Sequence, residues 1–372
     1  MAHLRPRSLS EAVKKQLKFW PILTILGPRQ SGKSTFLREI ALPQDSFSYV
    51  SLDRIAARDA ANRNPENFLL QFEKYPLIID EAHKAPPVFD EIKAVVDENR
   101  RPGRFILTGS VRFSSKLGIR ESFTGRVANL KFDSMTVQET LQKKPTLKEL
   151  HRYLKMGGMP AVCFLRDTDQ IQRYWTEWLE TTCQRDLQEL GKGRLSGDLA
   201  YQILESVCIL ELPNSAEIAA KLRVDARRVR THLEALENLF LIRPWDPSPG
   251  SVGKTLYLPF DCGMAQYFQA PLRRIWQTAF AHQTLNQARF DGKPEPKLQY
   301  NLTARGSFCD FVIDKEAILF NDEAYPSPRT MIRVQALEKR LPKYRITVAS
   351  QTDQPPQKIS KKTQSRPWCD WF

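Results

Sequence analysis

One eleven-residue stretch, ILGPRQSGKST at 25–35, restricts the folds open to this chain more than any other feature of its sequence. It contains the pattern GxxxxGK[ST], in which two glycines flank four loop residues and a lysine and a hydroxyl residue follow. A short apolar run, ILTIL at 22–26, precedes the pattern, and a helix-compatible segment follows it. Backbone N–H groups in such a strand–loop–helix turn can surround phosphates. The stretch therefore predicts a phosphate-binding α/β fold.

Each residue type in the loop has a chemical reason to be there. Gly27 and Gly32 permit backbone conformations and close approaches that a β-carbon would block. Lys33 brings a positive charge to the outer phosphates, and Ser34 offers a hydroxyl to the Mg²⁺ ion that bridges them. We expect the phosphates of a nucleotide to be bound by Gly27, Gln30, Ser31, Gly32, Lys33, Ser34 and Thr35. The alternative is a glycine turn that merely joins a strand to a helix.

A second motif, LIIDEAHK at 77–84, places two carboxylates directly after an apolar strand. The carboxyl ends of parallel strands meet at the edge of a sheet where ligands bind, so both acids can face the phosphate loop. We expect Asp80 to bind Mg²⁺ and Glu81 to polarise the attacking water. His83 reads as a surface or supporting residue. The alternative is an acidic helix start after a strand.

Two further stretches offer residues to the same chemistry. ILTGS ends another apolar strand at Ser110, whose hydroxyl could report the terminal phosphate, although an ordinary strand-ending turn would use the same residues. ESFTGRV at 121–127 carries Arg126 after a glycine, which makes it a candidate charge-stabilising finger for phosphoryl transfer. An arginine that acts on a neighbouring molecule would require a homo-oligomer.

Apolar runs at 22–26, 48–52, 75–80 and 104–109 alternate with helix-like segments. This alternation is typical of a parallel sheet with crossover helices, so we predict an α/β fold of the P-loop NTPase type.

The order of GPRQSGKST, SLD, LIIDEAHK, ILTGS, TGR and GGMPAV (157–162) resembles a large family of prokaryotic AAA-type ATPases. In that family a P-loop domain precedes a C-terminal domain of unknown function. The resemblance covers nearly the whole chain and is strongest up to about residue 160. It implies an ATPase that uses ATP and Mg²⁺, with the loop, Asp80, Glu81, the 108–110 turn and Arg126 in the roles given above. The expected domains are an ATPase domain (1–140), a helical connection (141–212), a winged helix (213–262), a nuclease-like domain (263–350) and a disordered tail (351–372).

The expected winged helix has support from the residues themselves. SAEIAAKL at 215–222 and the longer ARRVRTHLEALENLFLI at 226–242 predict two helices about a tight turn, as in helix-turn-helix proteins. The strand-like stretches FLIRPW and KTLYLPF would supply the wing. The second helix begins with Arg227, Arg228 and Arg230, where a recognition helix contacts DNA. The alternative is a helix pair that packs on a protein partner and leaves a solvated basic face.

The nuclease-like domain is expected to be inactive. The strand FCDFVI carries Phe308 where relatives have an acid, and it keeps only Asp310. The preceding helix shows Gln277 and Gln283 at positions where acids would be expected. One carboxylate cannot build the metal site that such a nuclease needs, so we predict a degenerate, non-cleaving domain.

Composition indicates which partners and which cellular compartment suit the protein. The 56 Lys and Arg against 42 Asp and Glu give a formal charge of +14, which attracts nucleic acid, an anionic membrane surface or an acidic protein. Six cysteines without a CxxC pair favour a reducing, cytoplasmic compartment. The early apolar run at 19–26 is too short to span a bilayer, so no membrane association is expected. In the tail, the aromatic cluster of Trp368, Trp371 and Phe372 could anchor a partner or fold back onto the domain.

Overall fold

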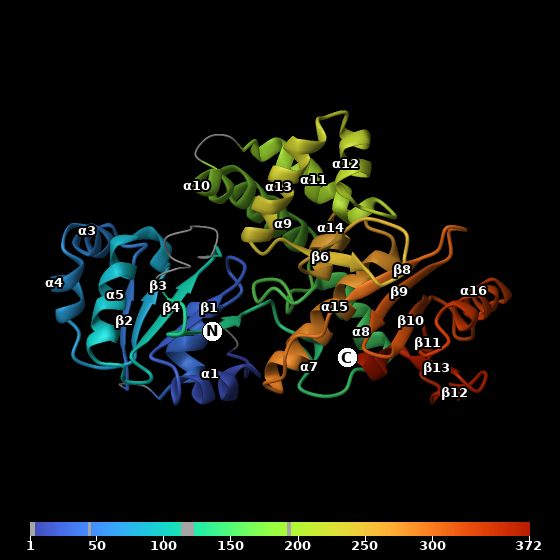
Figure 1. The fold of residues 1–372 in the computed structure, drawn as a ribbon, viewed down its shortest axis with the longest axis horizontal. Coiled ribbons are helices and arrows are strands. Elements are labelled where there is room, and N and C mark those ends of the chain that lie inside the picture. Colours follow the sequence, from blue (N-terminus) through green and yellow to red (C-terminus); the bar gives the residue numbers. More distant parts are fainter. Residues whose placement is uncertain (1–3, 44–45, 113–122, 192–194) are drawn as a thin grey trace. The chain divides into compact units, whose positions relative to one another are not determined.

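The structure is a computed structural model that describes residues 4–43, 46–112, 123–191 and 195–372 (Figure 1). The chain divides into two compact units. The first unit comprises residues 1–134 with 238–240 and 289–293, and the second comprises 135–237, 241–288 and 294–372. The first contains a parallel sheet, and the second contains helices and a mixed sheet.

The sheet of the first unit has five parallel strands in the order β2-β3-β4-β1-β5. The strands are β1 (Ile22–Leu26), β2 (Ser48–Ser51), β3 (Leu77–Asp80), β4 (Phe105–Gly109) and β5 (Val127–Lys131). Because all five run the same way, the segments that follow β1, β3 and β4 leave the sheet at one edge. The strand order reverses at β1, which lies between β4 and β5, and such a reversal opens a crevice for ligands. The expected α/β class is confirmed.

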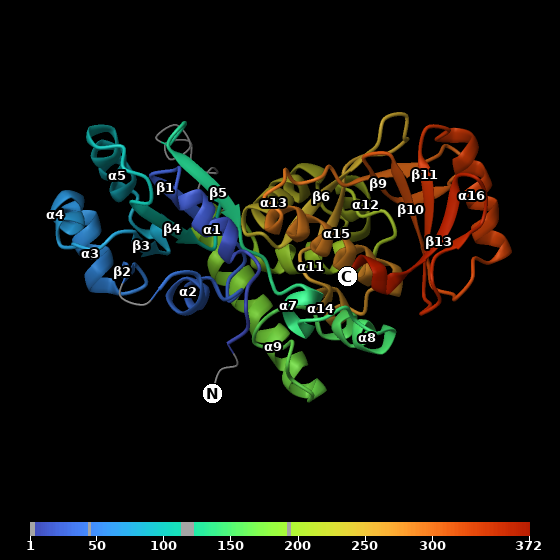
Figure 2. The same cartoon turned by 90° about the horizontal axis from the view of Figure 1, so that it is seen from below.

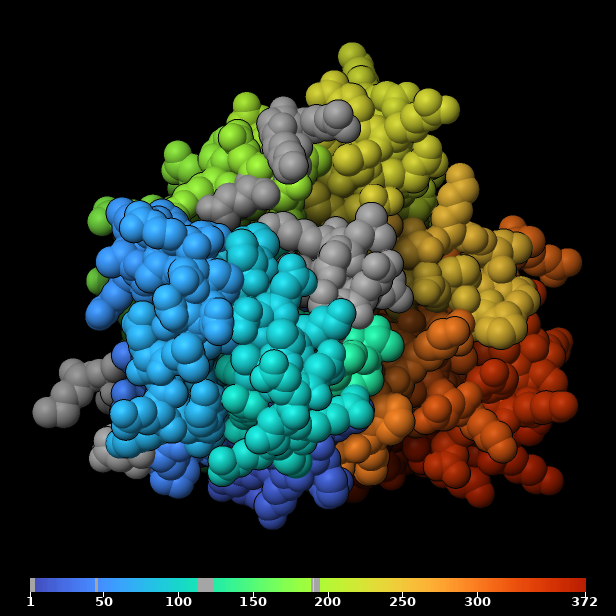
Figure 3. Space-filling view, turned by 60° about the vertical axis from the view of Figure 1, so that its left-hand side comes forward, coloured from blue at the N-terminus to red at the C-terminus, as the bar shows by residue number. Residues whose placement is uncertain are grey.

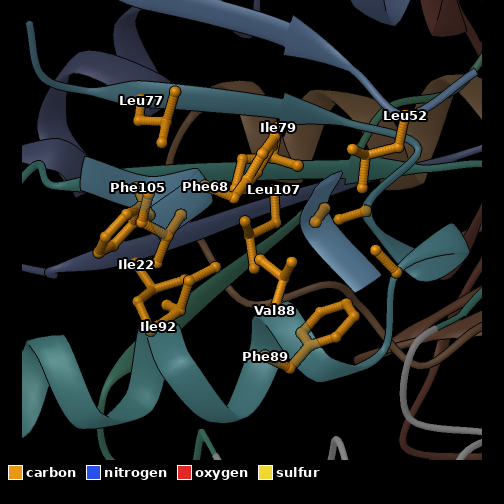
Figure 4. Packing of buried hydrophobic residues seen from close by; sticks show 14 of the residues in the cluster. Ile22, Leu52, Phe68, Leu77, Ile79, Val88, Phe89, Ile92, Phe105 and Leu107 are labelled. Carbon is orange, nitrogen blue, oxygen red and sulfur yellow. The ribbon is translucent and has the colours of Figure 1, made fainter. Parts of the chain in front are cut away.

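Helices cover both faces of this sheet. They are α1 (Ser10–Leu17), α2 (Lys33–Phe36) continued by η1 (Leu37–Ala41), α3 (Ile55–Arg63), α4 (Pro65–Leu70), η2 (Ala82–Lys84) and α5 (Pro87–Glu98). Figure 4 shows Val88, Phe89 and Ile92 of α5 against the apolar side chains of one sheet face. On the other face Leu23 and Ile25 of β1 pack with residues of α1 and α2. Both faces are therefore buried, which is why these strands read as continuous apolar runs.

The second unit contains helices along its whole length. They are α7 (Val137–Leu141), α8 (Leu147–Met156), α9 (Thr168–Thr181), η4 (Thr182–Asp186), α10 (Leu187–Gly191), α11 (Gly197–Ile209), α12 (Ser215–Leu222), α13 (Ala226–Asn238), α14 (Cys262–Tyr267), α15 (Leu272–Phe290) and α16 (Pro328–Arg340). Helices α12 and α13 form the expected pair about a tight turn. Asn214 caps the first of them with hydrogen bonds from the N–H groups of Ala216 and Glu217.

The mixed sheet of the second unit has the order β12-β13-β11-β10-β9-β8-β6-β7. Figure 2 labels its strands β9, β10, β11 and β13. Its strands are β6 (Ile242–Pro247), β7 (Leu256–Pro259), β8 (Gln299–Leu302), β9 (Phe308–Ile313), β10 (Glu316–Asn321), β11 (Arg345–Ser350), β12 (Gln357–Lys358) and β13 (Thr363–Pro367). The β6–β7 hairpin after α13 continues into β8 through a parallel pairing of Asp246 with Gln299. The hairpin and the strands beyond residue 299 therefore share one sheet.

The C-terminal segment corrects the expectation of a disordered tail. Residues Thr363–Pro367 form β13, which pairs with β11 in parallel, and Trp368–Trp371 form the short helix η5. Trp368 is fully buried, and its indole N–H donates to the carbonyl of Ala349 at 2.9 Å. The segment is ordered because β11 gains a hydrogen-bonded neighbour and the aromatic side chains gain an apolar environment. The aromatic cluster folds back onto its own unit.

The six cysteines are buried and reduced. Among the described residues, none of the helices combines the length and the apolar character that a bilayer crossing requires.

Candidate nucleotide-binding site

The phosphate loop leaves β1 and enters α2, with glycine at the two positions that need it. Gly32 has φ 96° and ψ 17°, a left-handed conformation that residues with a β-carbon rarely adopt. A β-carbon added to Gly27 would lie 1.8 Å from the carbonyl oxygen of Phe132, which follows β5. Gln30 also has a positive φ of 59°. The backbone of the loop therefore has the conformation of a phosphate-binding turn without a bound ligand.

Lys33 is the buried cation of the loop, with 5% of its surface exposed. Its ammonium donates to the carbonyl oxygens of Gly27 and Pro28, both at 2.9 Å. Burial lowers the pKa of Lys33, while the charges of Glu81 and Asp80 act in the opposite direction. Two of the three ammonium donors are thus satisfied by the loop itself, which holds the positive charge over the turn.

Ser31 and Thr35 differ in burial, although both belong to the predicted phosphate loop. Ser31 is fully buried, and its hydroxyl oxygen has no hydrogen-bond partner among the described residues. An unsatisfied buried hydroxyl inside a phosphate loop fits a site built for a polar ligand. Thr35 lies on an exposed position of α2.

Asp80, at the end of β3, accepts hydrogen bonds from three hydroxyl groups. Ser34 donates to one carboxylate oxygen at 2.7 Å, and Tyr49 of β2 donates to the same oxygen at 2.6 Å. Thr108 of β4 donates to the other oxygen. Burial raises the pKa of Tyr49, and the hydrogen bond to Asp80 raises it further, so Tyr49 remains a donor. Neighbouring strands therefore fix the carboxylate from both sides.

The donor set fits a magnesium ion. Ser34 and Asp80 place a hydroxyl and a carboxylate oxygen 2.7 Å apart beside the phosphate loop. Mg²⁺ prefers hard oxygen ligands, and in P-loop proteins it takes few from the protein and others from the nucleotide phosphates. These two side chains would hold it.

Glu81 has a left-handed backbone, with φ 53° and ψ 44°. This conformation costs about 1–2 kcal/mol for a residue with a β-carbon, and strain of this kind concentrates at functional sites. Its carboxylate accepts hydrogen bonds from the backbone N–H and the hydroxyl of Ser110, both at 3.2 Å. His83 Nδ1 lies 3.3 Å from the same oxygen. Ser110 is thus a neighbour of the expected base, and His83 supports it.

Arg126 does not lie at this site within its own chain. Its carbonyl accepts from the N–H of Ile22, the first residue of β1, whereas the phosphate loop follows the last. The length of β1 separates the two, about 16 Å for five residues. The guanidinium instead makes a paired contact with Asp97 of α5, at 2.5 and 2.9 Å. The structure brings together Lys33, Ser34, Asp80 and Glu81, and leaves Arg126 at the opposite edge of the sheet.

Two residues of the site were missed by sequence reasoning. Tyr49 lies on β2, and its contact with Asp80 follows from the pairing of β2 with β3, which the linear motif does not show. Arg7 precedes the first helix and donates to the carbonyl of Ser31 at 3.1 Å. No motif marks it, since only the folded chain brings residue 7 to residue 31.

The GGMP stretch in the second unit has a structural explanation. The N–H of Gly158 donates to the carboxylate of Asp261 at 3.0 Å, and a β-carbon on Gly157 would lie 2.0 Å from that carboxylate. A β-carbon on Gly158 would lie 1.9 Å from the carbonyl oxygen of Met135. Both glycines are needed because other parts of the chain pass too close for a side chain.

The arginines at the start of α13 are all on the surface. Arg227, Arg228 and Arg230 are exposed, whereas Val229 and Leu233 of the same helix are buried. Figure 3 shows the yellow surface that α12 and α13 present to solvent. The helix is thus amphipathic, with its basic side chains directed away from the core.

Asp310 on β9, the remaining acid of the nuclease-like region, is bound by an arginine. Arg273 of α15 contacts both carboxylate oxygens, at 2.7 and 3.0 Å, and Gln277 donates at 2.7 Å. The backbone N–H of Phe320 adds a fourth bond at 2.9 Å. Burial alone would raise the pKa of Asp310, but the charge and hydrogen bonds of Arg273 hold it below its usual range. Phe308 and Gln283 are buried, and no group of three metal-ligating side chains occurs in the part of the chain described.

A parallel sheet of this strand order, with a phosphate loop after β1 and paired acids after β3, defines a P-loop domain of the AAA type. The family model described as an AAA domain matches residues 20–141. A second model, of a domain of unknown function (DUF8612), matches residues 147–258. Residues 20–141 therefore match an AAA domain, and a domain of unknown function follows it.

The similar proteins are distant. Uncharacterized proteins of Mycobacterium tuberculosis and Mycobacterium bovis are each 24% identical over 250 residues, which cover 67% of this chain and 55% of theirs. The chain thus spans about half the length of these relatives. Among solved structures, a Walker-type ATPase of Pyrococcus abyssi has a TM-score of 0.44 and 14% identity, covering 72% of this chain and 99% of its own. The DNA clamp loader delta protein of Bacillus subtilis has a TM-score of 0.27 and 14% identity, covering 62% and 88%.

Proposed function

We propose that the protein binds ATP with Mg²⁺ at the phosphate loop and hydrolyses it to ADP and phosphate. The nucleotide state then changes how the second unit holds a partner. The observation that carries the proposal is the convergence of Lys33, Ser34, Asp80 and Glu81 at one edge of the sheet. The 2.7 Å bond between Ser34 and Asp80 joins the two halves of this site.

The side chains divide the work according to their chemistry. Lys33 would contact the outer phosphates and offset their charge. Ser34 and Asp80 would hold Mg²⁺, which would offset the charge that develops on the outer phosphates. Glu81 would accept a proton from the attacking water, since it neighbours the metal-binding acid without sharing its hydroxyl donors. Ser110 fixes the position of the Glu81 carboxylate.

A steady-state phosphate-release assay tests this function. The parent protein is compared with Lys33→Ala, Glu81→Gln and the control Glu98→Gln, which removes an exposed acid at the end of α5. Glu81→Gln should lower the turnover rate by at least about a hundredfold, as loss of a general base does, while binding of a fluorescent ATP analogue persists. Lys33→Ala should lose both the turnover and the binding of the ATP analogue. The same low rate in the parent and in every variant would refute hydrolysis.

A second candidate function is a nucleotide-controlled module that binds nucleic acid and hydrolyses ATP slowly. One observation favours it: residues 221–230 carry exposed basic side chains and a single acid. The basic residues are Lys221, Arg223, Arg227, Arg228 and Arg230. None of them has an ion-pair partner among the described residues, and Asp225 is engaged in capping α13 through the N–H of Arg227 at 2.7 Å. Such a surface would attract phosphates strongly. The β6–β7 hairpin follows α13 in the chain, as a wing would follow the second helix of a winged helix.

Fluorescence anisotropy with labelled duplex DNA at two salt concentrations tests the second function. The double variant Arg227→Ala, Arg228→Ala should weaken binding and reduce its salt dependence, because two phosphate contacts are lost. The control Lys358→Ala, Lys361→Ala removes the same charge from exposed positions of the second unit. Equal loss in both double variants would indicate non-specific attraction. No binding at low salt would reject the function and favour a protein partner for this face.

A role for Arg126 remains a proposal that needs an oligomer. Its position at the amino edge of the sheet allows it to reach a nucleotide only in another copy of the chain. Mixing Arg126→Ala with Lys33→Ala proteins tests this. Recovery of activity in the mixture would support a shared site, since each variant supplies what the other lacks, and the absence of recovery would leave Arg126 as a structural partner of Asp97.

A further inference from the structure

Arg7 is a buried arginine that contacts two separate parts of the first unit. Its guanidinium donates to the carbonyl of Ser31, in the phosphate loop, at 3.1 Å. It also donates to the carbonyls of Asp133 and Ser134, at 2.8 and 3.5 Å. Only 8% of its surface is exposed. A single side chain therefore spans the loop and the chain segment that leaves the first unit.

Phe132 strengthens the same connection. The Arg7 guanidinium lies 4.0 Å from the centre of its ring, which is within cation–π range. The N–H of Phe132 donates to the carbonyl of Leu26 at 2.7 Å, and its own carbonyl lies against Gly27. The start of the loop and the end of β5 are thus in backbone contact, while Arg7 joins the far part of the loop to the next two residues.

The chain passes into the second unit directly after Ser134, and its first residue there is firmly held. The N–H of Met135 donates to the carbonyl of Gly158 at 2.7 Å, and its carbonyl accepts from the hydroxyl of Tyr153 at 2.8 Å. Gly158 leaves no room for a side chain here. Two residues further on, α7 begins with a capping box between Thr136 and Glu139. A displacement of residues 133–134 is therefore passed to an ordered segment.

We propose that Arg7 is a positioning residue that couples the phosphate loop to the connection at 133–136. The guanidinium is a rigid planar fork whose donors keep fixed relative positions. A movement of the Ser31 carbonyl when nucleotide enters must therefore carry Arg7 with it or break one of its bonds. If Arg7 moves with the carbonyl, the movement reaches residues 133–136. Through Met135 it then reaches the GGMP segment. The inference rests on the proposed nucleotide binding and adds the route by which it acts.

Hydrogen–deuterium exchange measures both ends of this route in the full chain. The experiments use Glu81→Gln as the background, so that added Mg²⁺-ATP is not consumed. The variants are Arg7→Met, which keeps much of the side-chain length, and Arg7→Lys, which keeps the charge but cannot span both sets of carbonyls. Lys14→Met, an exposed cation on α1, is the control.

In the background and in the Lys14 control, Mg²⁺-ATP should slow exchange in residues 27–36 and also in 132–141. In Arg7→Met and Arg7→Lys the slowing at 27–36 should remain, and the slowing at 132–141 should be lost. A purely structural role would change the exchange of both segments without ATP and leave their response to ATP intact. If Arg7→Met does not fold, Arg7→Lys decides the question.

Two results would overturn the inference. Slowing at 132–141 that equals the background value in the Arg7 variants would show that the connection responds without Arg7. An absence of slowing at 27–36 in the background would refute nucleotide binding itself, and with it the coupling. The two failures are distinguishable because each affects a different segment.

Discussion

At the level of single residues, the site depends on glycines that allow one piece of backbone to approach another. Gly27 admits the carbonyl of Phe132, and Gly158 admits the carbonyl of Met135. In both cases a β-carbon would overlap a backbone atom, which cannot rotate away as a side chain can. Sequence patterns mark such glycines but do not distinguish phosphate binding from close packing. In the structure, close packing explains Gly158. At Gly27, close packing adds to the requirement of the phosphate loop.

Gly158→Ala should destabilise the protein by about 1–3 kcal/mol or more, the usual cost of overpacking a closely packed site. Urea unfolding followed by fluorescence measures the change. Gly250→Ala is the control. Gly250 has a positive φ of 77°, which Gly158 does not, but no atom lies within 4 Å of the carbon added there. Gly250→Ala should cost only about 1 kcal/mol. Equal losses in the two variants would contradict the packing explanation.

Tyr49→Phe should leave the fold intact and weaken the response to metal. The substitution removes one of the hydroxyl donors that orient Asp80, and loss of a residue that orients a metal ligand typically costs about tenfold or more in metal affinity. We therefore expect a higher Mg²⁺ concentration for half-maximal phosphate release. Tyr325→Phe, at an exposed position, is the control. An unchanged Mg²⁺ titration would remove Tyr49 from the site.

At the level of elements, strand neighbours decide what a motif can do. Asp80 ends β3, but its hydrogen-bond partners come from β2, β4 and α2, which contribute Tyr49, Thr108 and Ser34. The apolar runs predicted β1 to β4, but they did not predict β5. They did not predict the order β2-β3-β4-β1-β5, because strand order depends on which faces the crossover helices cover.

The strand β9 carries an ion pair that should make stability depend on pH. The pKa of Asp310 is lowered in the folded protein, so its contribution is present above the unfolded value of about 4 and is lost as pH falls through the folded value. Asp310→Asn should cost about 3–5 kcal/mol at pH 7, because it leaves Arg273 without its buried partner. The difference from the parent should shrink at pH 3.

Urea unfolding at several pH values checks this prediction. Asp322→Asn, at an exposed position, should change little at any pH. A penalty for Asp310→Asn that stays constant down to pH 3 would show that the charge of Asp310 does not stabilise the fold.

At the level of the whole molecule, the central question is whether the AAA domain and the basic face of α13 influence each other. Allosteric coupling is reciprocal, so an effect of ATP on DNA binding implies an equal effect of DNA on ATP binding. We expect the DNA affinity of Glu81→Gln to differ by about 5- to 150-fold with and without Mg²⁺-ATP. Anisotropy titrations of labelled DNA and of a fluorescent ATP analogue should give the same factor. Unequal factors would indicate that the measured changes are not binding equilibria.

The sequence by itself determined the parts that depend on neighbours along the chain. The phosphate loop needs glycine, lysine and serine at fixed spacing, and the acidic pair needs only a preceding strand, so both were correctly placed in the fold. Long-range contacts decided the rest. Arg126 follows a glycine as a finger arginine would, yet parallel pairing puts it at the far edge of the sheet. The tail is polar and contains proline, yet pairing with β11 orders it.

Arg7 shows the same limit most clearly. Its neighbours in sequence say nothing about its partners, which lie 24 and 126 residues away. Only tertiary structure can bring a guanidinium to carbonyls so distant in the chain, because the energy that holds it there comes from the packing of Phe132 and the loop rather than from any local preference. The residues of the candidate site could therefore be named from the sequence, whereas the contacts of Arg7 were decided by the fold.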